Sequence, residues 1–158
     1  MEDKILQPFS FDGRANRFRL ELRTLIPLTN TCIVAKDFAE KYTGQNELSK
    51  SAELLLQEGS EIAIVTNGLN GSWVCTRDGL SIHQPAFPFP KTADTTGCGD
   101  SYHGAFLVGL LKGFTVEKAA TIASAVAAMN SQGLGGISGI PQFDEVLKFL
   151  AMNGITLE

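Results

Sequence analysis

The strongest chemical signal in this sequence is the stretch DTTGCGD at residues 94–100. Gly97 and Gly99 carry no side chain, so main-chain N–H groups there can approach a ligand closely. A helix is expected to begin at this point, and the free N–H groups and dipole of a helix N-terminus favour an anion, most naturally a phosphate. The pattern therefore predicts a phosphate-binding loop that opens a helix.

Asp100 closes this stretch and lies in the first turn of the expected helix. Two interpretations of this carboxylate are open, and the residues alone favour neither. An acid at a helix start interacts favourably with the helix dipole. A carboxylate beside a phosphate site can also act as a general base for an attacking hydroxyl. The spacing of the stretch matches neither the P-loop GxxxxGK[ST] nor the dinucleotide-binding GxGxxG.

Strands and helices must position this loop, and their expected order can be read from periodicity and turn residues. Thr115 is expected to cap the penultimate helix, whose first turn carries Glu117. The alternation of the two element types predicts an α/β fold with a largely parallel sheet. Strands are expected at 5–11, 31–34, 62–66, 72–76 and 80–83, and helices at 16–25, 36–43, 47–57, 99–112, 115–130 and 142–151.

Length and composition limit the class of protein. The chain has 158 residues, 44% of them hydrophobic, which suits one ordinary globular domain. A net charge of −4 argues against a nucleic-acid or anionic-membrane partner, and no apolar run reaches the ~18 residues of a membrane span. The three cysteines are scattered along the chain, which predicts free thiols. The first residues lack the pattern of a secretory signal, so a cytoplasmic location is expected.

DTTGCGD, followed by the small-residue run SYHGAFLVGLL, resembles the second signature of the PfkB (ribokinase-like) carbohydrate kinases, DTxGAGD, with Cys98 where alanine is usual. Residues 64–71 resemble the family's strand and TxGxxG turn. Residues 115–141 resemble its Ala-rich helix and late nucleotide-side loop, and residues 32–44 its "viaseeFA…LTG" segment. The resemblance runs from about residue 7 to residue 150.

The resemblance implies a three-layer α/β/α, ribokinase-like fold with a largely parallel sheet, incomplete relative to the family. Its motifs belong to the C-terminal, nucleotide-binding half of these kinases, so residues 1–158 are assigned to that half. The N-terminal sugar-binding half and the lid are not represented. A homo-oligomer, or a partner that supplies the missing half, is therefore expected.

The resemblance also assigns roles to the loop residues. Asp100 matches the general base that takes a proton from a primary sugar hydroxyl as its oxygen attacks the γ-phosphate of ATP. The N–H groups around Gly97, Cys98 and Gly99 match an anion hole for the transferred phosphoryl group.

Other residues match family positions that contact the nucleotide or bind a cation. Residues expected beside the nucleotide are Thr66, Gly68, Gly71, Gly133 and Gly135.

Asp94 matches an acid that helps to bind a monovalent cation in many members. Mg²⁺ is expected with ATP, although the Asn-x-x-Glu segment that organises it in many relatives reads Ala35-Lys36-Asp37-Phe38 here. The serine of ribokinase's monovalent-cation site is replaced by Gly139.

Two other functions compete with the kinase interpretation. A non-catalytic remnant would bind nucleotide or a partner chain only, because the sugar-binding half is missing. A dinucleotide-dependent oxidoreductase is disfavoured, since no early strand–GxGxxG–helix unit is present. We expect ATP and a sugar as ligands, and neither nucleic acid nor membrane.

Overall fold

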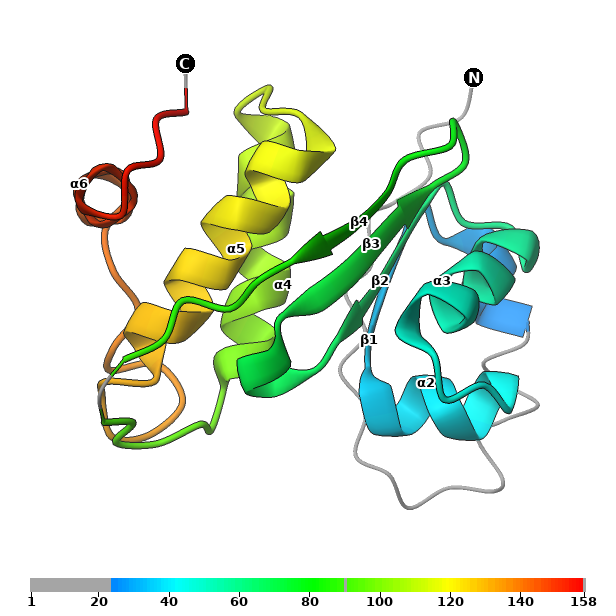
Figure 1. Cartoon of the computed structure of the whole chain (residues 1–158), viewed down its shortest axis with the longest axis horizontal. Helices are drawn as coiled ribbons and strands as arrows, with labels where there is room; N and C mark the ends of the chain where they lie inside the picture. Colours follow the sequence, from blue (N-terminus) through cyan, green and yellow to red (C-terminus); the bar gives the residue numbers. More distant parts are fainter. Residues whose placement is uncertain (1–23, 90, 158) are drawn as a thin grey trace. The chain divides into compact units, whose positions relative to one another are not determined.

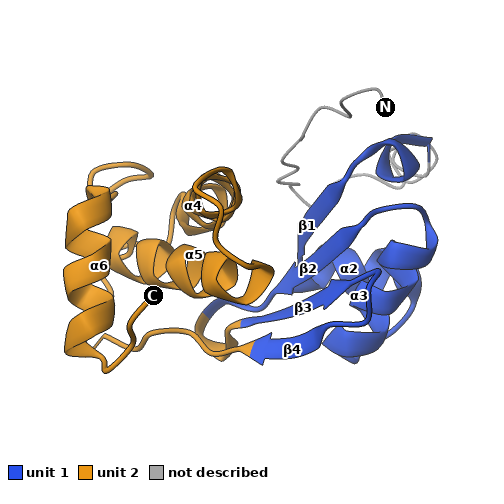
Figure 2. Ribbon diagram, turned by 90° about the horizontal axis from the view of Figure 1, so that it is seen from above, with its two compact units in different colours: residues 1–68, 72–83 blue, residues 69–71, 84–158 orange. Residues whose placement is uncertain are grey.

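A computed structural model describes residues 24–89 and 91–157 (Figure 1). The expected strand at 5–11 lies outside these residues, as does most of the expected helix at 16–25. Two compact units share the chain: residues 1–68 with 72–83, and residues 69–71 with 84–158 (Figure 2). No helix in the described ranges is both long and apolar enough to cross a bilayer.

The first unit is a four-stranded sheet in the order β1-β2-β3-β4, with helices packed on it. Strand β1 (Thr31–Ala35) runs parallel to β2 (Ile62–Thr66), and β3 (Ser72–Thr76) runs antiparallel to β2. Strand β4 (Ser81–Gln84) follows β3 through a tight turn at 77–79, as the sequence predicts.

Within the described residues the sheet is mixed rather than largely parallel. The physical reason is the length of the connections. Parallel neighbours need a crossover of a dozen or more residues, whereas β2 and β3 are joined by the short segment 67–71, which contains the turn η2 (Gly68–Asn70). The turn between β3 and β4 is shorter still, so both connections enforce antiparallel pairing.

Helices α2 (Lys36–Thr43) and α3 (Leu48–Gln57) lie beside the sheet, as Figure 1 shows. A core of small and medium side chains joins them to the strands. Gly44 ends α2 with φ +75° at its C-cap. A short 3-10 helix, η1 (Ile26–Leu28), precedes β1, and Ile26 is buried in the same core. The fully buried members of this core are Ala39, Ala52, Leu55, Ala63 and Val65.

The second unit is built from three helices: α4 (Cys98–Leu111), α5 (Val116–Asn130) and α6 (Phe143–Met152). Helix α4 packs closely against α5, where Gly109 leaves room for Ala119. Thr115 caps α5 by accepting a hydrogen bond from the Lys118 N–H, as its sequence position predicts. Val146 and Leu150 of α6 are buried against α5 residues.

Candidate functional site

The DTTGCGD stretch forms a loop that turns directly into α4, as the sequence predicts. Gly97 is the N-cap of α4 and has φ +74°, a backbone conformation that L side chains rarely adopt. Its carbonyl accepts the Ser101 N–H at 2.8 Å, which closes the first helical turn. Among the described residues no side chain caps this helix. N–H groups in the first turn of α4 that have no partner within the chain are therefore available to an anion.

The three amides expected in the anion hole differ in their partners. The Cys98 N–H donates to the Thr95 carbonyl at 3.2 Å, so it already closes a turn within the loop. For Gly97 and Gly99 the described part of the chain supplies no such acceptor. Burial and the nearby Asp94 carboxylate both raise the pKa of the Cys98 thiol above its ordinary value, which opposes activation of this thiol.

Asp94 connects this loop to a second one. One carboxylate oxygen accepts the Thr96 N–H at 2.9 Å, and the other accepts the Gly135 N–H at 2.9 Å. Hydrogen bonds from Thr96, and then from Gly135, hold the pKa of Asp94 below its ordinary value of 3.8. Asp94 therefore joins two chain segments that are 41 residues apart.

The second segment, residues 131–141, is the late loop expected beside the nucleotide. It follows α5 and touches the first loop so closely that a Cβ on Gly97 would lie 2.2 Å from the Gly136 carbonyl oxygen. Gly133 is equally constrained, since a Cβ there would lie 2.5 Å from the Ser138 Oγ. The lack of space for a Cβ therefore requires glycine at both positions. At Gly97 the positive φ is a second reason.

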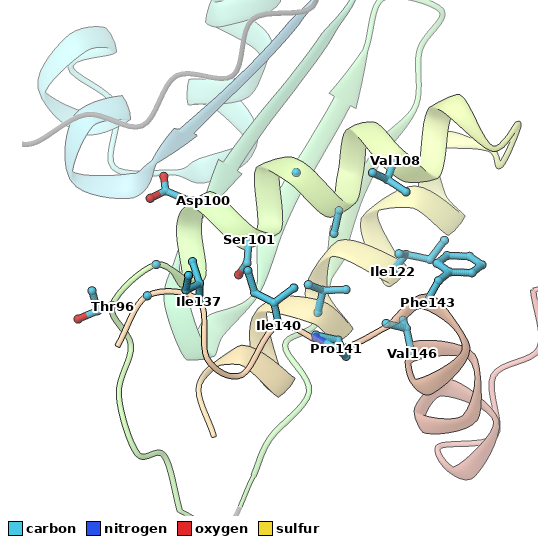
Figure 3. A pocket seen from close by; sticks show the side chains of 15 residues that line it. Thr96, Asp100, Ser101, Val108, Ile122, Ile137, Ile140, Pro141, Phe143 and Val146 are labelled. Carbon is cyan, nitrogen blue, oxygen red and sulfur yellow. The ribbon is translucent and has the colours of Figure 1, made fainter. Parts of the chain in front are cut away.

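A pocket of about 520 Å³ opens between these loops and the helices of the second unit. Its two ends differ in chemistry, as Figure 3 shows: Thr96 and Asp100 mark one end, and Phe143 and Val146 the other. Between them the wall is almost entirely apolar. Its apolar lining residues are Ala105, Val108, Ile122, Val126, Ile137, Ile140 and Pro141.

Asp100 lies in the first turn of α4, is solvent-exposed and lines this pocket. The structure thus brings Asp100 and Gly97 into one pocket, with the late loop forming its rim. The pocket volume falls within the 300–1,000 Å³ typical of small-molecule sites. No group of three or more His, Cys, Asp or Glu side chains gathers in the described ranges to form a metal site.

Three further residues were expected on the nucleotide side. Thr66 and Gly68 belong to the first unit, where the Thr66 hydroxyl donates to the Val34 carbonyl at 3.4 Å. Gly71 belongs to the second unit, where a Cβ would lie 2.1 Å from the Gln84 carbonyl oxygen. Their role at the nucleotide stays a prediction.

Sequence reasoning missed two features of this site. The apolar wall comes from α4, α5, α6 and the late loop, and residues such as Ile122 look like ordinary core residues in the sequence. Asn130, the last residue of α5, is fully buried and donates from Nδ2 to the Gly136 carbonyl at 3.0 Å. An asparagine at the end of an Ala-rich helix was the only available signal.

Comparison with known proteins adds the family context. The model of a family described as pfkB family carbohydrate kinase matches residues 4–142. The chain is 33% identical over 108 residues to a 5-dehydro-2-deoxygluconokinase of Listeria monocytogenes, covering 68% of this chain and 32% of the relative. It is 31% identical over 120 residues to a nucleoside kinase of Methanocaldococcus jannaschii, covering 72% and 39%.

Solved structures confirm the expected ribokinase-like α/β fold. The crystal structure of the M. jannaschii nucleoside kinase, described as a member of the ribokinase family, superimposes with a TM-score of 0.79 at 28% identity. A ribokinase from Thermotoga maritima gives 0.77 at 27% identity. These superpositions cover 93% and 92% of this chain, but only 48% and 49% of the two structures. The chain therefore spans about a third to a half of the relatives that it matches.

Proposed function

Because this chain belongs to the pfkB family of carbohydrate kinases, we propose that it is the nucleotide-binding part, residues 1–158, of a kinase. That kinase transfers the γ-phosphoryl group of ATP to a primary hydroxyl of a sugar or sugar-like substrate. One observation carries the proposal: the DTTGCGD loop opens α4 beside a pocket that has Asp100 at one end and an apolar wall leading away from it.

Asp100 is proposed as the general base. As the substrate oxygen attacks the γ-phosphorus, its O–H proton passes to the Asp100 carboxylate, and ADP leaves with the electron pair of the broken P–O bond. A base must be able to reach substrate, and Asp100 is exposed at the pocket. It lies in the same helical turn as the anion-binding amides.

The start of α4 is proposed to stabilise the charge on the transferred phosphoryl group. The left-handed turn at Gly97 and the hydrogen bond from the Ser101 N–H to the Gly97 carbonyl fix this segment. In it the N–H groups of Gly97 and Gly99 have no partner among the described residues, while that of Cys98 donates to Thr95. Amides that are already oriented before reaction need no reorganisation as charge develops, which is the physical basis of an anion hole. Gly97, Cys98 and Gly99 form this segment.

The apolar pocket wall is proposed to take the base and sugar of the nucleotide. Gly133 and Gly135 on the late loop are proposed to lie beside the nucleotide, and the same role for Thr66, Gly68 and Gly71 stays a prediction from the family resemblance. Mg²⁺ is proposed to arrive with ATP, because this ion keeps several waters and binds substrate phosphates with only one or two carboxylates. Such binding needs no multi-carboxylate cage from the chain.

A monovalent cation beside Asp94 is a separate proposal. Both Asp94 oxygens already accept backbone N–H groups, so its first function is to join the two loops. A cation bound there would share carboxylate oxygens of Asp94 that already accept these hydrogen bonds, so it would be held weakly. We therefore propose ATP and Mg²⁺ as required ligands and a monovalent cation only as a modulator of the loop.

The substrate class stays broad. The matched relatives are named as kinases of different acceptors: 5-dehydro-2-deoxygluconokinase, nucleoside kinase and ATP-dependent 6-phosphofructokinase, at 33%, 31% and 27% identity. Because identity changes so little among them, we infer that the matched segment carries the shared phosphoryl chemistry. Acceptor choice would then depend on residues that lie outside the matched segment.

The alternative is a protein that binds nucleotide without transferring phosphate. The observation that favours it is the short span of the chain relative to its relatives. The two proposals differ in one measurement: the alternative predicts saturable ATP binding with no ADP formed in the presence of any hydroxyl acceptor. The kinase proposal predicts ADP formation that depends on the acceptor.

Asp100→Asn tests the proposed chemistry, because it keeps the shape of the side chain and removes the base. Measured by ADP formation in the complete enzyme, kcat should fall by roughly 10²–10⁴-fold while ATP affinity changes little. Asp144→Asn is the matched control, since Asp144 is also an exposed acid in the first turn of a helix but does not line the pocket. Equal effects of the two changes would assign Asp100 to the helix dipole alone.

A further inference from the structure

Asn130 is a buried polar side chain to which the proposed phosphoryl transfer assigns no role. It is the last residue of α5 and has 0% relative exposure. Asparagine is rarely buried unless its amide is hydrogen-bonded. Its contacts therefore show what the side chain does.

Three contacts connect Asn130 to the late loop. Its Nδ2 donates to the Gly136 carbonyl at 3.0 Å, and its own carbonyl accepts the Gly133 N–H at 3.1 Å. Gly139 lies so close that a Cβ there would be 2.4 Å from the Asn130 carbonyl oxygen. The loop from 133 to 139 thus folds around this one residue.

The Gly136 carbonyl that Asn130 holds also faces the first loop. A Cβ on Gly97 would lie 2.2 Å from its oxygen and 2.7 Å from the Gly136 Cα. Any displacement of Gly136 therefore changes the space left for Gly97. Since Gly97 is the N-cap of α4, its position sets where the first helical amides point.

Stability alone does not account for an asparagine here. Its Oδ1 is buried and has no hydrogen-bond partner in the described part of the chain. A buried acceptor without a partner lowers stability, and an apolar side chain of similar shape would avoid that loss. The remaining reason for an amide at this position is its Nδ2 donor.

We propose that Asn130 is a positioning residue for phosphoryl transfer: its Nδ2 fixes the Gly136 carbonyl against Gly97 and thereby fixes the loop that opens α4. This inference rests on the proposed kinase function for its kinetic consequence. Its structural consequence, an ordered late loop, is independent of that function.

Asn130→Leu tests the proposal, because leucine has a similar size and lacks the donor. Loss of one such hydrogen bond should raise KM for ATP about tenfold, and kcat should fall because the anion-binding amides are displaced. The melting temperature should stay within a few degrees of wild type or rise. Ser124→Ala is the matched control, since Ser124 is buried on the same helix and donates to the Pro85 carbonyl at 2.9 Å.

Hydrogen exchange supplies the readout that does not require turnover. In Asn130→Leu the Gly135 amide, which donates to Asp94, should exchange at least tenfold faster, while the Ala125 amide within α5 keeps its wild-type rate. Asn130→Ala should show the same pattern if the leucine variant does not fold.

The outcomes separate the two proposals. If the full-length wild-type kinase binds ATP but forms no ADP with any hydroxyl acceptor, the kinase function fails, and loop exchange alone decides the role of Asn130. Unchanged KM with unchanged loop exchange in a folded variant would overturn the positioning role. A parallel loss of melting temperature and activity, with exchange rising equally in α5 and the loop, would also overturn it and leave only a structural role.

Discussion

Gly97→Ala is the perturbation whose effect the structure defines best. Gly97 has φ +74°, and an L side chain in this region costs roughly 1–2 kcal/mol. The new Cβ would also lie 2.2 Å from the Gly136 oxygen, more than 1 Å inside an ordinary contact of about 3.5 Å. Such overpacking typically costs about 1–3 kcal/mol more.

We therefore expect Gly97→Ala to lower the free energy of unfolding by about 2–5 kcal/mol. Urea titration followed by circular dichroism measures this value. Gly44→Ala is the matched control, because Gly44 has φ +75° and an added Cβ would meet no atom within 4 Å. In this variant the free energy of unfolding should fall only by the cost of the positive φ, about 1–2 kcal/mol. Equal losses in the two variants would refute the close contact between Gly97 and Gly136.

Gly99→Ala separates function from stability in the same loop. Gly99 lies in the first turn of α4, has an ordinary negative φ and has open space around its Cβ position. Alanine there should not destabilise the fold, because it is a better helix former than glycine. The added methyl group lies among the N–H groups proposed to bind phosphate, so ATP affinity should still fall. A variant with wild-type ATP affinity would contradict the anion hole.

The remaining predictions concern Asp94 and the thiols. Asp94→Asn leaves only one of the two oxygen acceptors, so hydrogen exchange of the Gly135 amide should accelerate. Asp100→Asn should leave this exchange rate unchanged, and NMR measures the rate in both variants. Because the pKa of Asp94 is lowered, its carboxylate should keep the loops joined as the pH falls to about 4 and release them only as the pH falls through the lowered pKa. Iodoacetamide should modify Cys98 slowly at pH 7 and faster as the pH rises toward its raised pKa, whereas Cys32, whose pKa burial raises to about 12, should stay unmodified in the folded chain.

Much of the local structure could be predicted from the sequence, because local interactions specify it. Helix α2 has the predicted bounds, and α5 begins after Thr115, whose hydroxyl caps it as expected. The hairpin of β3 and β4 was predicted from Arg77-Asp78-Gly79 between two short strands. The mixed character of the described sheet does not follow from the alternation of elements, because it depends on the five-residue link between β2 and β3, which is too short for a parallel crossover.

The site was predictable only where a short motif contains it. DTTGCGD identified the loop and Asp100 because both lie within seven residues. The partners of that loop come from far along the chain: Gly135 is 41 residues from Asp94, and Gly136 is 39 residues from Gly97. No periodicity or spacing links such positions, so the apolar pocket wall and the role of Asn130 emerged only from the fold.

A site built from backbone amides has a consequence for which residues matter. An N–H group cannot be removed by ordinary substitution, so its direction is set by whatever holds the main chain around it. Here that support comes from glycines that leave no space for a Cβ, from the Asp94 carboxylate and from the Asn130 amide. Substitutions with the largest effect on phosphate binding should therefore fall on residues whose side chains do not contact phosphate, and Asp100 stands apart as the one side chain proposed to react.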